Sequence, residues 1–215
     1  MNDIESIIKK IKRCIKGFEN PVVTQIANAY KDPFKILIST ILSLRTKDKT
    51  TREASLRLFE KGDTLQKIIA LSNREIEKLI YPVGFYHRKT VTIKKISEQV
   101  AKNNGKVPDT LEGLLKLPGV GRKTANLVLS EGFGKPAICV DTHVHRVSNR
   151  LGLVKTETPI QTEFALMKVL PEKFWSIYNT IVVPFGQNIC KPISPFCSKC
   201  SLNEMCPKLG VKKHR

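Results

Sequence analysis

The spacing of apolar residues predicts helices along almost the whole chain. The first segment is amphipathic, because its isoleucines recur at intervals of three and four with lysines between them: Ile4, Ile7, Ile8, Ile11 and Ile15. Residues 33–44 are nearly all apolar and follow Asp32 and Pro33, which suit a helix start. We expect a buried helix there, because the run is long for a buried strand.

Further helices are expected in four segments, namely residues 50–59, 65–71, 72–80 and 88–103. Ser72 and Glu75 have the spacing of a capping box. The last segment carries apolar residues at broadly helical intervals: Val91, Ile93, Ile96 and Val100. Period-two alternation is confined to residues 137–140. The sequence therefore predicts an all-α fold built from many short helices.

Composition adds a strong basic bias. The chain of 215 residues has 37 Lys and Arg against 19 Asp and Glu, a net charge of +18. This bias implies a polyanionic partner, most often nucleic acid. Solubility alone explains it less well, because the basic residues cluster: Lys9, Lys10, Lys12, Arg13 and Lys16; Arg45, Lys47, Lys49 and Arg52; Lys208, Lys212, Lys213 and Arg215. Charge does not distinguish an enzyme from a passive binder.

Two classes of protein are not expected. No apolar run approaches the roughly 20 residues that span a bilayer, so we expect no membrane association. The first residues include Asp3 and Glu5 and contain no apolar signal core, which argues against secretion. The six cysteines are then expected to stay reduced, and a metal site is a better interpretation than disulfides.

A glycine-rich turn, LPGVGRKTA, occupies residues 117–125. Gly119 and Gly121 permit a tight turn around Val120 whose amides point outward. The next helix is expected to begin near Arg122, which adds exposed N–H groups and the positive end of a helix dipole. This pattern indicates a corner that binds DNA phosphates, with Lys123 as one phosphate contact. A plain linker between two helices is the alternative.

An acidic residue interrupts the basic region in the run VDTHVHRV, residues 140–147. Asp141 is either an N-cap of the next helix or a functional carboxylate, and both roles are compatible. His143 and His145 are two positions apart and face different directions on a helix, so we expect them to be structural. No motif of a zinc-dependent deaminase occurs.

Four cysteines lie close together near the C-terminus, separated by six, two and five residues: Cys190, Cys197, Cys200 and Cys206. A zinc ribbon usually separates its two cysteine pairs by a dozen or more residues. The compact spacing suits a cubane iron–sulfur cluster better, and zinc is the alternative. Cys14 and Cys139 lie in apolar surroundings and are expected to be ordinary buried residues.

Together these motifs resemble the endonuclease III family of helix-hairpin-helix DNA glycosylases. LPGVGRKTA, VDTHVHRV and the four-cysteine loop match its signatures, and DPFKILISTILS, LIYPVGFYHRK and FGQNIC extend the resemblance over nearly the whole chain. The resemblance implies a six-helix barrel of residues 22–135. It also implies a cluster domain of residues 1–21 and 136–215, which would give the N-terminal isoleucine stripe its partner.

The resemblance assigns roles to individual residues. Lys123 would be the amine that displaces the base and forms a Schiff base, and Asp141 the carboxylate that stabilises the positive charge on the sugar. The four cysteines would hold a 4Fe-4S cluster that organises a loop against DNA. Arg45 stands where the family commonly has a Gln that fills the gap of the extruded base. Phe85 matches an apolar wedge, with a core aromatic as the alternative.

The expected function is removal of oxidised or damaged pyrimidines from duplex DNA, followed by cleavage at the abasic site. The base would be flipped into a pocket between the two domains. An adenine-mismatch glycosylase would carry a glutamate where Thr40 stands, and thymine-mismatch relatives usually replace the lysine. A non-catalytic DNA-binding module would not need both Lys123 and Asp141. We expect a cytoplasmic, nucleoid-associated monomer.

Overall fold

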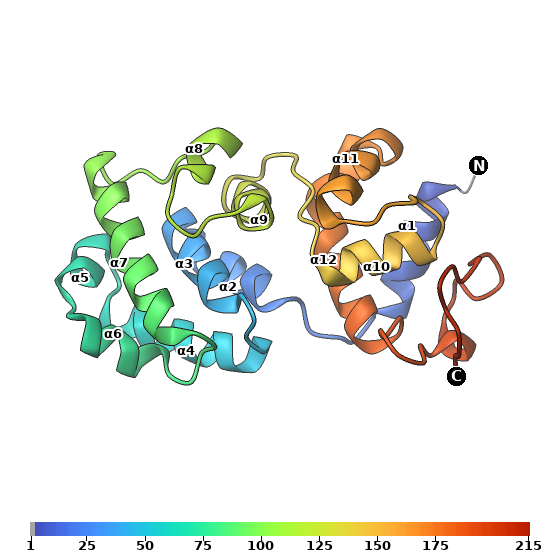
Figure 1. The fold of residues 1–215 in the computed structure, drawn as a ribbon, viewed down its shortest axis with the longest axis horizontal. Helices are drawn as coiled ribbons and strands as arrows, with labels where there is room; N and C mark the ends of the chain where they lie inside the picture. The colour runs from blue at the N-terminus through green and yellow to red at the C-terminus, as the bar shows by residue number, and fades with distance from the viewer. Residues whose placement is uncertain (1–2) are drawn as a thin grey trace. The chain divides into compact units, whose positions relative to one another are not determined.

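The computed structural model describes residues 3–215, and within that range helices are the only regular elements (Figure 1). The prediction of an all-α fold is confirmed. The chain divides into two compact units: unit 1 comprises Met1–Pro21 with Pro136–Arg215, and unit 2 comprises Val22–Lys135. No described helix has both the length and the apolar character needed to cross a membrane.

Unit 2 is built around one buried helix. Its elements are α2 (Val22–Tyr30), α3 (Pro33–Ser43), α4 (Asp48–Lys61), α5 (Leu65–Ala70), α6 (Asn73–Ile80), α7 (Tyr86–Lys102), α8 (Leu111–Leu115) and α9 (Arg122–Phe133). Phe34 and the seven consecutive residues from Ile36 to Leu42 are buried, and α3 packs against α2, α4, α7 and α9. The nearly all-apolar run in the sequence therefore becomes the centre of this unit.

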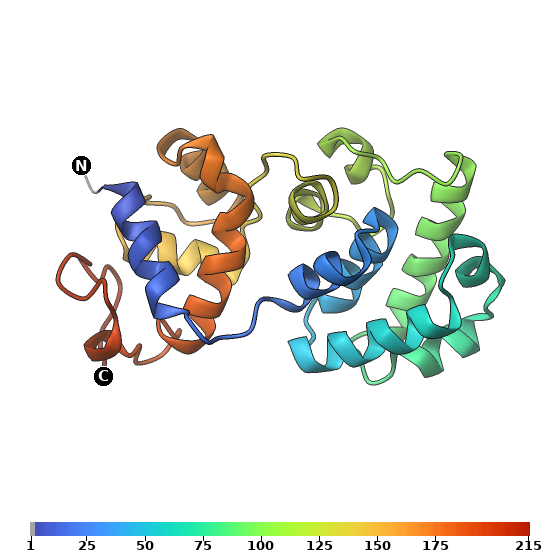
Figure 2. The same ribbon diagram turned by 180° about the vertical axis from the view of Figure 1, so that it is seen from behind.

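Unit 1 joins the two ends of the chain. It contains α1 (Ile4–Cys14), α10 (Thr142–Arg150), α11 (Pro159–Val169), α12 (Trp175–Asn188) and two 3-10 turns, η1 (Glu172–Phe174) and η2 (Cys197–Lys199). Ile7, Ile8 and Ile11 of α1 belong to the same buried cluster as residues of α10 and α12. Both ribbon views show α1 beside α12 (Figures 1 and 2). The isoleucine stripe thus has its expected kind of partner.

Helix starts agree closely with the capping signals in the sequence. The Asp32 carboxylate Oδ1 accepts hydrogen bonds from the amides of Phe34 at 2.8 Å and Lys35 at 3.4 Å. The expected capping box at the start of α6 is present, with Ser72 and Glu75 bonded reciprocally. Side-chain oxygens thus pair amides that the first turn of a helix leaves without a partner.

The expected buried stripe of α7 needs one correction. Val91 is 45% exposed, whereas Lys89 is only 7% exposed. The buried positions run through Lys89, Ile93, Ile96 and Val100, at spacings of four, three and four. An apolar pattern search passes over Lys89 because its side chain is charged, although its position fits the helical period.

Three helices were not expected from the sequence: α2, α11 and α12. In α12 the helical pattern of the sequence is obscured by Pro184, which lies inside the helix and is buried. Residues 137–140 form no strand; they are buried, and the Asn179 side-chain amide donates to the carbonyl of Cys139 at 3.1 Å.

The cap of α3 gives a stability prediction. Asp32→Ala removes the acceptor of two amides and should lower the free energy of unfolding by about 1 kcal/mol. Asp32→Asn should keep most of that energy, because an amide oxygen also caps helices. Urea denaturation followed by circular dichroism measures both. Asp63→Ala, which breaks an exposed ion pair with Lys67, is the control and should change little. Equal stability of wild type and Asp32→Ala would contradict the role of the cap.

Candidate functional site

The glycine turn joins α8 to α9 and depends on one of its two glycines for its shape. Gly119 has a φ of 72°, and a Cβ there would lie 2.9 Å from Cγ2 of Thr92. Gly121 has a φ of −97° and a ψ of 176°, which any residue adopts. Of the two glycines, only Gly119 therefore uses a backbone angle that other residues avoid. Val120 between them is buried, at 7% exposure, and anchors the turn.

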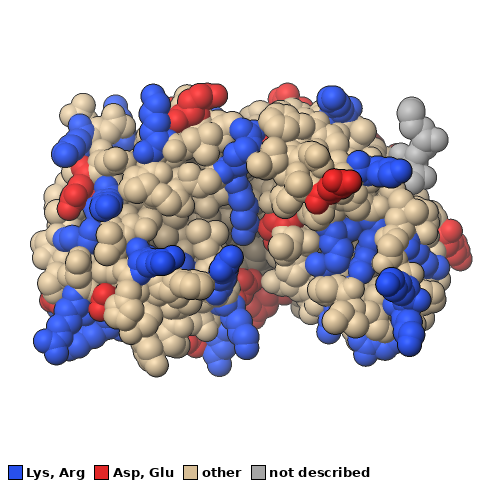
Figure 3. Space-filling view, viewed as in Figure 1, with Lys and Arg blue, Asp and Glu red and all other residues tan. Residues whose placement is uncertain are grey.

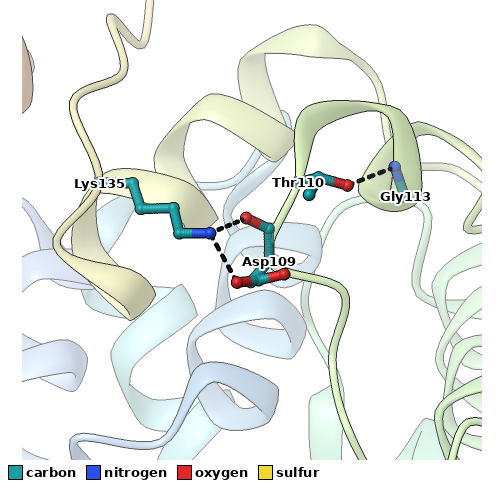
Figure 4. Close-up of polar contacts among 4 residues, drawn as sticks. All are labelled: Asp109, Thr110, Gly113 and Lys135. Carbon is teal, nitrogen blue, oxygen red and sulfur yellow. Dashed lines mark hydrogen bonds and ion pairs between the residues drawn. The ribbon is translucent and has the colours of Figure 1, made fainter.

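An ion pair connects the segment after α9 to the segment before α8 (Figure 4). The Lys135 ammonium, just beyond α9, donates to the backbone carbonyl and to Oδ2 of Asp109, each at 2.6 Å. The next residue, Thr110, caps α8 by accepting from the amide of Gly113 at 3.1 Å. The end of α9 is thereby tied to the start of α8, which are the two helix ends opposite to the glycine turn.

The first two residues of α9 are the basic pair of the motif. Helix α9 begins at Arg122, as expected, and Lys123 follows; both side chains are partly exposed. The N-cap residue Gly121 has no side chain and supplies no capping bond. The first-turn amides and the helix dipole therefore make the start of α9 electropositive, a setting that favours an anionic group.

Asp141 caps α10. Its Oδ1 accepts from the amides of His143 at 2.9 Å and Val144 at 2.8 Å. Oδ2 takes part in neither bond. The N-cap interpretation is confirmed, and it fixes the direction of a carboxylate that is only partly buried. The buried segment before it is held by Asn179, as described above.

The two histidines of the motif have different partners, as the helical spacing predicts. Nδ1 of His145 lies 2.6 Å from the Thr162 hydroxyl on α11. Nδ1 of His143 lies 3.1 Å from the guanidinium of Arg146. Arg146 also donates to the carbonyls of Gly186 at 2.9 Å and Cys190 at 3.0 Å. Burial lowers the pKa of this guanidinium. Arg146 thus links α10 to the segment where the cysteines begin.

The four C-terminal cysteines line one cavity of unit 1, together with apolar side chains that include Leu151, Phe185 and Ile189. All four are partly buried and reduced. Arg150, at the end of α10, donates to Cys190 Sγ at 3.6 Å and to the carbonyls of Lys191 at 2.6 Å and Pro192 at 2.7 Å. Its charge therefore faces a thiol, and its hydrogen bonds hold the loop that follows Cys190.

The arrangement of the thiols does not by itself define a site for a single metal ion. Within residues 3–215, no three His, Cys, Asp or Glu side chains come close enough to hold one metal ion. Burial raises the pKa of the Cys197 and Cys206 thiols, and the neighbouring Cys190 raises both further. The thiolate forms of Cys197 and Cys206 are thus disfavoured unless positive charge is supplied.

Of the remaining cysteines, one differs from expectation. Cys139 is buried, at 1% exposure, as expected. Cys14 is only partly buried and lies against the cysteine loop, with its Sγ 3.0 Å from the Ser201 hydroxyl. The Ser201 hydroxyl also donates to the carbonyl of Lys10 at 2.8 Å. The end of α1 is therefore fastened to this loop, a contact that residue spacing within the loop does not reveal.

Arg45 and Phe85 are brought together in unit 2. Phe85 is 55% exposed, so its interpretation as a core aromatic is wrong. The guanidinium carbon of Arg45, also exposed, lies 5.6 Å from the centre of the Phe85 ring. Thr40, by contrast, is buried and donates to the carbonyl of Ile36 at 2.7 Å. A neutral hydroxyl occupies the position where an adenine-mismatch enzyme would carry an acid.

Basic side chains are spread over the surface of both units. On the face drawn in Figure 3, Lys and Arg clearly outnumber Asp and Glu. This matches the excess of 37 basic over 19 acidic residues in the sequence. Such a surface attracts a polyanion by long-range electrostatics that weaken as salt increases.

Comparisons with known proteins agree on one family. A family model described as "HhH-GPD superfamily base excision DNA repair protein" matches residues 38–172. The chain is 54% identical over 176 residues to "Endonuclease III" of Thermotoga maritima, covering 81% of this chain and 83% of that protein. It is 42% identical over 214 residues to "Endonuclease III homolog 2, chloroplastic" of Arabidopsis thaliana, covering 93% of this chain and 55% of that longer protein.

A solved structure supports the same assignment. "Structure of a non-covalent Endonuclease III-DNA Complex" matches with a TM-score of 0.83 and 38% identity, covering 97% of each chain. Fold and sequence therefore agree over almost the entire length. The chain belongs to the endonuclease III family within the HhH-GPD superfamily of base excision DNA repair proteins.

Proposed function

We propose that this protein removes damaged pyrimidines from duplex DNA and then cleaves the abasic strand, with Lys123 as the attacking amine. The observation that carries the proposal is the place of Lys123 at the partly exposed, electropositive start of α9 in a chain of this family. The hairpin around Gly119, Val120, Gly121 and Arg122 would hold the DNA backbone through its amides and positive charge.

The proposed chemistry uses one amine and one carboxylate. The Lys123 nitrogen bonds to C1′ of the deoxyribose while the glycosidic bond breaks, and the base leaves with the electron pair and gains a proton. The nitrogen lone pair then breaks the C1′–O4′ bond, the ring oxygen takes up a proton, and a protonated imine forms at C1′. The imine acidifies C2′; loss of a C2′ proton breaks the C3′–O3′ bond, and the 3′ phosphate leaves as an anion. The Asp141 carboxylate stabilises the positive charge on the sugar and takes part in proton transfer.

Another lysine, Lys89, is buried and does not suit the nucleophilic role. Lys89 is 7% exposed, and its ammonium donates to three acceptors: Leu42 O, Leu44 O and Thr46 Oγ1. Those bonds use all three N–H groups of the ammonium. Its chemistry is therefore that of a fixed cation, which leaves Lys123 as the better candidate.

We also propose that unit 1 carries a 4Fe-4S cluster held by Cys190, Cys197, Cys200 and Cys206. The cavity these thiols share is lined mainly by apolar side chains together with Arg150, and the four cysteines lie closer together in sequence than the two cysteine pairs of a zinc ribbon. This donor set fits a cluster, which presents several irons to four separate thiolates, better than it fits zinc. When bound, the cluster would supply structural order to the loop; the reaction above transfers no electrons.

The Lys123 assignment predicts a covalent adduct. Wild-type protein mixed with abasic-site DNA and borohydride should give a crosslinked band on a denaturing gel, because borohydride reduces the imine to a stable amine. Lys123→Ala should give none. Lys116→Ala, which changes an exposed lysine at the end of α8, is the matched control and should retain the adduct. An undiminished adduct in Lys123→Ala would exclude this role.

Substitutions of Asp141 can separate the catalytic effect of its negative charge from its stabilising effect as an N-cap. Asp141→Asn keeps an N-cap oxygen but removes the negative charge, so thermal stability should stay close to wild type. The single-turnover rate of base release should fall by roughly 100-fold, because the positive charge on the sugar is no longer stabilised. Asp141→Ala should lose both stability and rate. A wild-type rate in Asp141→Asn would limit Asp141 to capping.

The cluster is tested by metal content. Protein isolated without oxygen should contain iron and acid-labile sulfide in 4Fe-4S stoichiometry, with little zinc. Cys197→Ala should lower the iron content, because one of four thiolate ligands is gone. Cys139→Ala is the control, since Cys139 is buried away from the cavity lining, and its iron content should match wild type. One zinc per chain and no sulfide would overturn the assignment.

A further inference from the structure

Two neighbouring loops of unit 2 each expose one residue in a left-handed backbone conformation. Arg45, just after α3, has a φ of 52°, and Phe85, just before α7, has a φ of 58°. Side chains with a Cβ adopt this conformation rarely, and it persists only where surrounding contacts hold it. Because both residues are exposed, burial of their own side chains does not explain why the conformation is kept.

The two loops are joined to each other through Thr46 and Gly84. The amide of Gly84 donates to the Thr46 hydroxyl oxygen at 3.2 Å. A Cβ on Gly84 would lie 2.6 Å from the carbonyl oxygen of Arg45, so this close approach of the backbones requires glycine. The approach also brings the Arg45 guanidinium over the Phe85 ring. The contact between Arg45 and Phe85 therefore depends on the contact of the two loops at Thr46 and Gly84.

Lys89 of α7 hydrogen-bonds to the loop that carries Arg45 and Thr46. Its Nζ donates to the carbonyls of Leu42 at 2.8 Å and Leu44 at 2.5 Å and to the Thr46 hydroxyl at 3.1 Å. The first two acceptors lie at the C-terminal end of α3, where carbonyls lack helical partners and a cation complements the dipole. Burial lowers the pKa of Lys89 to about 8. A buried ammonium is thus placed so that it fixes three points of the Arg45 loop.

We propose that Lys89 is a positioning residue for DNA recognition: its ammonium fixes the Arg45 loop against the start of α7, so that Arg45 and Phe85 meet DNA as one preformed stacked pair. The inference rests on the proposed function, in which this pair contacts DNA. The ring suits stacking between bases, and the guanidinium suits hydrogen bonding to an unpaired base edge or a phosphate. Preforming the pair removes the cost of ordering two exposed side chains during binding.

The same helix provides a matched control. Lys94 of α7 is partly buried, and its Nζ donates to the carbonyls of Ile69 and Leu71. It therefore fastens a neighbouring loop in the same manner as Lys89, but that loop carries neither Arg45 nor Phe85. Lys94→Met and Lys89→Met remove equivalent ammonium groups, and only the second should affect DNA recognition specifically.

The test measures binding without bond cleavage, using full-length protein. The probe is a duplex with a tetrahydrofuran abasic analogue opposite 2-aminopurine, whose fluorescence rises when it is unstacked. Lys89→Met should raise the Kd roughly tenfold, the size of a lost stacking contact, and should reduce the fluorescence rise at saturating protein. Lys89→Arg, which keeps the charge and the donors, should restore much of both signals. Lys94→Met should behave as wild type.

A double-variant comparison separates positioning from general stability. In the background Arg45→Ala with Phe85→Ala, the further change Lys89→Met should have no additional effect on Kd, because the pair it positions is gone. An additive effect, or equal losses in Lys89→Met and Lys94→Met at matched thermal stability, would overturn the inference. Failure of the proposed function is distinguishable, because it would show as absence of base release and of the borohydride adduct in the wild type itself.

Discussion

An α-helix leaves backbone amides unpaired at its start and carbonyls unpaired at its end, and Asp141, Lys123 and Lys89 each lie or bond at such a helix end. Asp141 caps α10 with its carboxylate. Gly121 leaves the start of α9 without a side-chain cap. Lys89 bonds carbonyls at the end of α3. A fold of many short helices has many such ends, and the charged side chains of Asp141, Lys123 and Lys89 lie or bond at three of them.

The two helix starts differ in electrostatic character because their N-cap residues differ. At α10 the Asp141 carboxylate already occupies the amides of His143 and Val144, so the helix dipole stabilises a resident negative charge. At α9 a glycine precedes Arg122 and Lys123, and the positive end of the dipole is directed outward. One helix therefore presents a fixed carboxylate and the other a region that attracts anions, which are the two components the proposed reaction requires.

Buried polar groups set the positions of the exposed ones. Lys89 and Arg150 are nearly inaccessible, at 7% and 9% exposure, and each donates two of its hydrogen bonds to backbone carbonyls. The carbonyls that Lys89 bonds precede Arg45, and those that Arg150 bonds follow Cys190. Long cationic side chains can reach backbone carbonyls that have no partner within a helix. Pairing these carbonyls is favourable, because a buried carbonyl without a hydrogen bond is costly. In both places a buried cation orders a segment that the helices alone do not fix.

The sequence by itself determined the helical fold class, the start of α9 at Arg122, the capping of α10 by Asp141 and the grouping of four cysteines, because these depend on local period, capping chemistry and spacing. Tertiary structure decided what depends on contacts distant in sequence. It placed Lys89 under the loop of Arg45, exposed Phe85, brought Cys14 to Ser201 across the chain ends and formed α12 despite Pro184. Those features arise from burial and from partners that no local pattern specifies.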